Sequence, residues 1–360
     1  MRGASGDWSF FPAREATGAF WGEWDELNRR LWAGHPFLDR RFVEPLLDYW
    51  GTGDEQIVAC RGGEGLVAAA ILVRRRPGFW QTFLPAQTQM APVLVGEYAV
   101  AREMLAAIQD PAVAIDFLCQ DPRYSPFAPG EDRKEMLGVP YAVTMAVNLD
   151  GGFQEYSEGR SRKLRQNIGK YRRRAEALGG SPELRRVSAV TELREAVARY
   201  GEIESRGWKG QQGTALNENN AQGKFYAAVM ELFGAGGRAD VFELWIGGRL
   251  AASRLLIGNA NFRIALKTTY DEEMSEYAPG RLLLYDMLKR LAGLPGPKRV
   301  EFYTKATREQ LAWATEQRTV FQVGLYRWTA LRRVAEVVRG IRRNARAVSE
   351  PKGASDGAAD

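Results

Sequence analysis

The 360-residue sequence is poor in the side chains that most often bind metals or form covalent bridges. It has one histidine, His35, and two cysteines, Cys60 and Cys119. A single histidine excludes a histidine-rich metal site, so we expect no metal cofactor. A Ser-His-Asp triad would have to use His35 itself. Each cysteine lies in an apolar run, which argues against a disulfide scaffold and indicates two buried free thiols in a reducing compartment.

Long apolar segments and nucleotide-binding signatures are also missing. No stretch approaches the roughly 20 apolar residues that a membrane-spanning helix needs, and residues 1–14 have no hydrophobic signal core. We therefore expect a cytoplasmic protein. No GxGxxG or GxxxxGK[ST] motif occurs, and no helix-turn-helix, zinc-finger or RNA-binding signature is present, so redox chemistry, nucleotide hydrolysis and nucleic-acid binding are not expected.

The chain contains an internal repeat with a spacing of 185 residues. Gly-Gly turns begin at Gly62 and Gly247, each between two apolar runs, which is a hairpin signal. A helical pattern and a closing strand follow in both halves, with Asp116 in "IDFL" and Glu301 in "VEFY" at the same spacing. The repeat predicts two copies of one α/β unit, although short apolar strings also resemble one another by chance.

With 45% hydrophobic residues the chain can build two cores of ordinary size. We expect a first domain over residues 1–150 and a second over 151–330. A basic amphipathic helix is expected over 331–349 and a disordered tail over 350–360.

A basic helix is predicted at the start of the second half, over residues 159–178. The chain has 50 Lys and Arg against 44 Asp and Glu, and the excess is concentrated in "GRSRKLRQNIGKYRRR". Apolar residues recur every three or four positions, which indicates a single apolar stripe, at Leu164, Ile168, Tyr171, Ala175 and Leu178. The cations could form a solvated face or a surface for nucleotide phosphates, lipid headgroups or an acidic carrier protein.

The stretch "YDEEMSEYAPGRLLLYDMLKRL", residues 270–291, predicts a loop that leads into a helix N-terminus. Pro279 and Gly280 interrupt the chain, and leucines at helical spacing follow Arg281. Such an end presents unpaired N–H groups and the positive pole of the helix dipole, which can bind a phosphate or a developing oxyanion. An ordinary helix start is the alternative.

Several segments together resemble the CelD/BcsL-like acyltransferases: "SRKLRQNIGKYRRRAEALGG", "ESRGWKGQQGTAL" and "ALKTTYDEEMSEYAPGRLLLYDML". The resemblance covers roughly residues 20–330. It implies a GNAT fold, often doubled as in the FemAB peptidoglycan aminoacyltransferases, here as tandem GNAT-like units that each hold a mixed sheet flanked by helices. It also implies acyl-CoA as the donor.

In that fold, backbone amides hold the acyl-CoA pyrophosphate where a central strand passes through a loop into a helix. The matching donor-binding residues are Tyr277, Pro279, Gly280, Arg281 and Leu282. The preceding strand alternates Phe262, Ile264 and Leu266 against Arg263, Ala265 and Lys267, so one face can line a site, and Lys267 is a further donor-binding candidate.

One departure from the resemblance concerns residues 301–314, "EFYTKATREQLAWA". Glu301, Phe302 and Trp313 match the pattern with which related sequences close the second unit, but Glu309 and Gln310 stand where Tyr-Lys is usual. A role of that pair cannot be transferred, which indicates a divergent acceptor or donor.

Acyl transfer needs a base, oxyanion stabilisation and a proton for the leaving thiolate. Glu204 is the first candidate for the base and Asp271 the second, although each could equally be a salt bridge or a cap. Tyr270 and Tyr277 are candidates to protonate the thiolate, or half-buried tyrosines at a strand end.

Trp208 and Lys209 are candidates to shape the acceptor pocket, although Trp208 could be a core residue. His35 is a further candidate for substrate binding.

We expect an enzyme that moves an acyl group from acyl-CoA or an acyl carrier protein to an amine or hydroxyl of a cell-envelope polysaccharide or lipid precursor. A sphingoid base, as in ceramide synthesis, is one acceptor of this class. The alternatives are a FemAB-like aminoacyl transferase that uses charged tRNA, and a non-catalytic accessory protein of an envelope or exopolysaccharide synthase. The acceptor would be a small molecule, a lipid or a glycan.

The last segment suggests peripheral contact with an anionic membrane. Residues 328–346 place apolar side chains at helical spacing, with arginines elsewhere around the helix. A helix packed on the protein's own core is the alternative. Membrane contact would place the protein on the inner face of the membrane.

Overall fold

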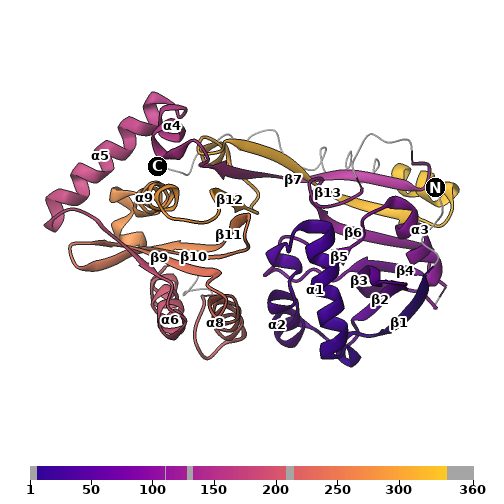
Figure 1. The fold of residues 1–360 in the computed structure, drawn as a ribbon. Helices are drawn as coiled ribbons and strands as arrows, with labels where there is room; N and C mark the ends of the chain where they lie inside the picture. Colours follow the sequence, from indigo (N-terminus) through magenta and orange to yellow (C-terminus); the bar gives the residue numbers. More distant parts are fainter. Residues whose placement is uncertain (1–5, 110, 128–132, 208–214, 339–360) are drawn as a thin grey trace.

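The computed structural model describes residues 6–109, 111–127, 133–207 and 215–338, which form two α/β units side by side (Figure 1). The strands of both units join in one continuous sheet. The basic helix expected over 331–349 lies mostly outside these residues, and the tail expected over 350–360 lies wholly outside them.

The first unit carries helices on both faces of its strands (Figure 1). Its elements are β1 (Asp7–Pro12), η1 (Ala13–Glu15), α1 (Gly18–Trp32), η2 (Pro36–Leu38), α2 (Arg40–Trp50), β2 (Gln56–Gly62), β3 (Gly65–Arg76), β4 (Phe79–Thr82), β5 (Val93–Leu94), α3 (Tyr98–Ala107), β6 (Ala114–Gln120) and β7 (Met136–Asn148).

The second unit places α5 and α9 on one face of its strands and α6 and α8 on the other (Figure 1). Its elements are α4 (Gly152–Glu158), α5 (Arg162–Gly179), β8 (Glu183–Val187), α6 (Val190–Arg206), α8 (Ala221–Gly234), β9 (Ala239–Ile246), β10 (Arg249–Gly258), β11 (Phe262–Tyr270), η3 (Glu272–Tyr277), α9 (Pro279–Gly293), β12 (Arg299–Phe302), α10 (Arg308–Leu311) and β13 (Glu316–Tyr326). Residues 329–338 form a further helix.

The repeat predicted from the sequence is present in the structure. Hairpin β2–β3 corresponds to β9–β10, whose turn residues Gly247 and Gly248 have φ angles of 57° and 77° that glycine adopts without strain. In each unit a parallel strand pair follows, β4–β6 and β11–β12, with Asp116 and Glu301 at equivalent positions. The 185-residue spacing therefore joins equivalent elements of two copies.

The two units exchange their last strands. β13 pairs with β6 of the first unit, whereas the end of β7 pairs with β12 of the second. β7 and β13 also pair with each other, antiparallel, from Met136–Leu325 to Ala146–Glu316. The strand order is β1-β2-β3-β4-β6-β13-β7-β12-β11-β10-β9-β8, and β5 pairs with β3. The predicted division at residues 150 and 151 lies in the turn between β7 and α4.

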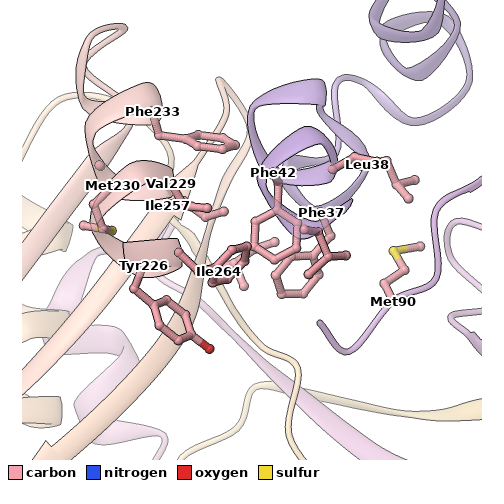
Figure 2. Packing of buried hydrophobic residues seen from close by; sticks show 14 of the residues in the cluster. Phe37, Leu38, Phe42, Met90, Tyr226, Val229, Met230, Phe233, Ile257 and Ile264 are labelled. Carbon is pink, nitrogen blue, oxygen red and sulfur yellow. The ribbon is translucent and has the colours of Figure 1, made fainter. Parts of the chain in front are cut away.

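One hydrophobic core crosses the boundary between the units. Figure 2 shows Phe37 and Phe42 of the first unit beside Phe233 and Ile264 of the second. The Phe42 ring also meets the ring of Phe225 on α8 edge to face, with centroids 5.6 Å apart. Because aromatic side chains bury large apolar areas, this shared core holds the units together as one body.

The two cysteines are buried free thiols, as predicted. Burial raises the pKa of the Cys119 thiol to about 11. Neither side chain is therefore suited to act as a thiolate nucleophile at neutral pH.

Candidate active site

The first turn of α9 offers a free backbone donor. Its N-cap, Ala278, has left-handed dihedral angles (φ 48°, ψ 52°), and Pro279 takes the first helical position. The N–H groups of Arg281 and Leu282 both donate to the Ala278 carbonyl. Within the described part of the chain, the N–H of Gly280 has no acceptor. Together with the helix dipole, this N–H suits the α9 N-terminus to an anionic group.

A cleft of about 710 Å³ lies beside this helix start, between α5, α9 and α10. The Arg281 guanidinium donates to the Tyr171 hydroxyl at 2.7 Å and forms an ion pair with Glu309. α5 contributes Lys163 to the lining and α10 contributes Arg308. Helix α5 covers most of the segment 159–178 expected to be a basic helix, and it supplies one wall of a cationic cleft.

Next to the cleft, the strands β11 and β12 separate. Their parallel pairing covers only Phe262–Ile264 of β11 and Arg299–Glu301 of β12. β12 ends one residue later at Phe302, whereas β11 continues to Tyr270. The remaining length of β11 has no strand partner on this side among the described residues, so its edge can bind an extended ligand that carries amide groups.

A β-bulge in β11 changes which face its later side chains use. Leu255 of β10 pairs with Lys267 and Leu256 pairs with Ala265, so Leu266 is an extra residue in the ladder. The strict alternation predicted for this strand is wrong beyond the bulge. Lys267 consequently lies on the α6 and α8 face, away from α9.

Lys267 and Glu204 form the centre of a polar cluster on that face. The Lys267 ammonium is 3.2 Å from Glu204 Oε2 and 3.3 Å from the side-chain oxygen of Gln222 on α8. Glu204 Oε2 also accepts the Leu216 N–H at 2.8 Å. Because Glu204 is 3% exposed, the paired ammonium balances a carboxylate that burial alone would disfavour.

Two tyrosines surround this ion pair. The rings of Tyr200 on α6 and Tyr226 on α8 have their centroids 5.8 and 5.1 Å from the Lys267 ammonium. Burial, and then the charge of Glu204, raise the pKa of both phenols. Both tyrosines are therefore neutral at physiological pH.

The region that holds these features matches a known family. Residues 162–311 match the model of the acetyltransferase (GNAT) domain. The match includes the α9 N-terminus, the separated strands and the Lys267–Glu204 pair. The second unit is thus similar to the acetyltransferase (GNAT) domain, and the chain has the fold of two GNAT-like units in tandem. No curated protein sequence matches the chain.

Solved structures share the fold at low sequence identity. FemX is 12% identical, with 84% of this chain and 95% of that chain covered and a TM-score of 0.53. The C-terminal domain of a candidate lysylphosphatidylglycerol synthetase from Agrobacterium fabrum is 14% identical, with 83% and 93% covered and a TM-score of 0.53. A tandem GNAT protein from the clavulanic acid biosynthesis pathway is 14% identical, with 88% and 98% covered and a TM-score of 0.49.

The other predicted residues of the GNAT domain occupy different positions. Asp271 is 1% exposed, caps η3 by accepting the Glu273 N–H and pairs with Arg249, so its carboxylate is already engaged. Tyr270 is exposed and lies near Gly280, whereas Tyr277 is half-buried just before α9. Trp208 and Lys209 lie outside the described residues.

His35 lies apart from the GNAT domain's polar cluster, in a buried network between the units. Its Nδ1 accepts the Phe37 N–H at 3.2 Å, and its Nε2 is 2.9 Å from the Tyr303 hydroxyl. Tyr303 donates to Asp121, which Arg318 also holds. Since Nδ1 is an acceptor, Nε2 carries the proton, and both ring nitrogens of this fully buried side chain are in use.

The sequence reasoning missed two groups at the site. The sequence places Tyr171 in the apolar stripe of α5, yet its hydroxyl accepts from Arg281 in the cleft. The second group is Arg254, whose signal in the sequence is a lone cation in the apolar run "LAASRLLIG". In the structure Arg254 lies near the point where β11 and β12 separate.

Proposed function

We propose that the second unit transfers an acyl group from acyl-CoA or an acyl carrier protein to an amine or hydroxyl. The acceptor belongs to a cell-envelope polysaccharide or lipid precursor, with a sphingoid base as one amine of this class. The main support is the coincidence of the GNAT match with the separated strands β11 and β12 beside the free Gly280 N–H.

The donor's phosphate-bearing arm fits the cationic cleft. A phosphate at the start of α9 would accept the Gly280 N–H and meet the Arg281 guanidinium, with Lys163 and Arg308 close by. The pantetheine amides would follow the unpaired edge of β11 and bring the thioester to the gap between the strands.

On the opposite face, Glu204 is the proposed base or acceptor-orienting group. Its carboxylate is buried beside the Leu216 N–H and the Lys267 ammonium, and an acceptor amine or hydroxyl within hydrogen-bonding distance of it could give it a proton. Tyr270 and Tyr277 are the proposed proton donors to the thiolate, and the raised pKa of Tyr277, caused by desolvation and by Glu276, keeps that phenol protonated.

Peripheral contact with an anionic membrane is part of the proposal. No helix of the described residues could cross a bilayer. In the helix at 329–338 and just before it, Trp328, Val334, Val337 and Val338 expose 40 to 61% of their surface. This apolar stripe is uncovered by the described part of the protein, which favours a helix that lies on a membrane over one packed on the core.

Charged tRNA is the second candidate donor, because the exposed cations of α5 could also hold RNA phosphates. Thermal stability separates the candidates, since a ligand that binds only the folded state raises the melting temperature. Acetyl-, octanoyl- and palmitoyl-CoA should each be compared with an aminoacyl-tRNA. Stabilisation by acyl-CoA supports the proposal, stabilisation by tRNA alone supports the alternative, and stabilisation by neither supports an accessory protein.

Gly280 provides the site-specific test. A Cβ at this position would meet only Tyr270 Cδ1 at an ordinary 3.7 Å, so substitutions are compatible with the fold. Gly280→Val should obstruct close approach of a phosphate to the helix start and raise the donor KM more than the acceptor KM. Gly280→Ala is the matched control with a smaller effect. A folded Gly280→Val protein with unchanged donor affinity would remove the donor assignment.

A further inference from the structure

Arg254 is a buried cation at the point where β11 and β12 separate. It lies on β10 and is 7% exposed. Its Nε donates to Thr268 Oγ1 at 2.8 Å, and its guanidinium carbon is 5.5 Å from the centroid of the Phe302 ring. Thr268 belongs to the part of β11 without a partner strand, and Phe302 is the last residue of β12. The guanidinium therefore bridges the two sides of the gap.

The charge of Arg254 is not balanced by the described residues. Its buried Nη1 has no hydrogen-bond partner there, and no carboxylate lies within ion-pair distance. Two other shielded arginines are paired with carboxylates: Arg318 with Asp121, and Arg263 with Asp240. Burial lowers the pKa of Arg254 to about 10, which still leaves it charged at neutral pH.

An unpaired buried charge opposes folding, so a fold that retains one at a ligand-binding gap indicates a ligand oxygen. Thr268, whose hydroxyl accepts from the guanidinium, is exposed. Nη1 itself is buried, so a ligand oxygen would have to enter between β11 and β12 to reach it.

We propose that Arg254 contacts the carbonyl oxygen of the acyl group and stabilises the oxyanion formed during transfer. This inference rests on the acyltransferase function proposed above. The acceptor nitrogen or oxygen attacks the carbonyl carbon, a new bond forms, and the carbonyl π electrons move to the oxygen beside Arg254. When the intermediate collapses, the C–S bond breaks, the base holds the acceptor's proton, and the thiolate takes a proton from a tyrosine or from water.

A transient anion explains the missing counterion better than a permanent one. A carbonyl dipole satisfies the Nη1 hydrogen bond but only partly balances the charge, whereas the oxyanion balances it fully. The interaction is therefore strongest in the transition state, and such an interaction raises kcat rather than ground-state affinity.

The test measures CoA release from acetyl-, octanoyl- and palmitoyl-CoA by wild-type protein, Arg254→Met and Arg254→Lys, with and without an amine acceptor. Arg254→Met should lower kcat by about 10²- to 10³-fold, with less than a threefold change in donor KM. Its melting temperature should equal or exceed that of the wild type, because an unbalanced charge is removed. Arg254→Lys should recover part of kcat.

Arg263→Met is the matched control. Arg263 is a shielded arginine on the neighbouring strand whose pairing with Asp240 has no link to the gap. This variant should lose thermal stability and keep kcat, the opposite of Arg254→Met.

A wild-type kcat in Arg254→Met overturns the inference and leaves the proposed function intact. A reduced kcat that accompanies a lowered melting temperature, without recovery by lysine, also overturns it, since Arg254 would then only support the strands. If the wild-type protein releases CoA from none of the donors, the proposed function fails, and the inference fails with it.

Discussion

Removal of the Glu309 charge is expected to tighten CoA binding. Glu309 lies on α10 at the cationic cleft and forms an ion pair with Arg281. A phosphate bound at the start of α9 needs the same guanidinium, so the carboxylate competes with the donor. Glu309→Gln keeps the size of the side chain and removes its charge.

The magnitude follows from the exposure of the pair. The side chains of Arg281 and Glu309 are 39% and 60% exposed, so their interaction is a surface ion pair of about 0.2–1 kcal/mol. Its removal should therefore lower the Kd of CoA by about 1.4- to 5-fold. Arg281→Gln should weaken binding by about tenfold, because a charge-assisted hydrogen bond contributes at least about 1.5 kcal/mol.

Isothermal titration calorimetry with CoA, at low and at high salt, measures both effects. Glu183→Gln is the control, since Glu183 pairs with Arg185 on β8, is 59% exposed and does not line the cleft. Both Glu309→Gln and Arg281→Gln should differ from wild type less at high salt. If Glu309→Gln binds CoA with wild-type or weaker affinity, Arg281 does not hold the donor phosphates.

Three further predictions concern the base, the unit interface and the membrane. Glu204→Gln should lose kcat and keep CoA affinity, with the loss eased at high pH for an amine acceptor; a wild-type rate at all pH values would exclude the role. Because burial lowers the pKa of His35 to about 3 from 6.5, the unfolded chain gains a proton below pH 6.5 that the folded chain excludes. Between pH 6.5 and 5 the free energy of unfolding should therefore fall by about 1.6 kcal/mol in all relative to His35→Gln, with a slope that approaches about 1.4 kcal/mol per pH unit at the acid end; equal slopes in urea titrations would contradict this. The full chain should sediment with anionic liposomes at low salt and less so at high salt or when cut before Trp328; a full chain that stays in the supernatant with anionic liposomes at low salt refutes the membrane proposal.

The repeated units were predictable because their signals are local. A Gly-Gly turn between apolar runs specifies a hairpin through the backbone angles that glycine allows, wherever the hairpin later packs. The helix start at Pro279 was equally visible, since proline and glycine act within one turn of chain. The phosphate-binding role of that start stays a prediction.

Side-chain direction after Ala265 could not be predicted. The alternating pattern of β11 assigns Lys267 to the same face as Ala265, and only the pairing with β10 reveals the extra residue that turns it toward Glu204. The pairing of Tyr303 with His35 and Asp121 was hidden for the same reason, since contacts across more than 100 residues have no local signal. The sequence shows Arg254 as a cation in an apolar run, but it does not show that no carboxylate pairs with this cation in the described part of the fold.

The strand exchange sets an order on synthesis. The edge of β6 is complete only when β13 pairs with it, and β13 leaves the ribosome about 200 residues after β6. At a synthesis rate of about 5–20 residues per second, the edge of β6 stays unpaired for about 10–40 s before β13 is made. During that interval an unpaired strand edge can associate with other chains. A nascent chain stalled before residue 316 should therefore depend more on chaperones than one released at full length.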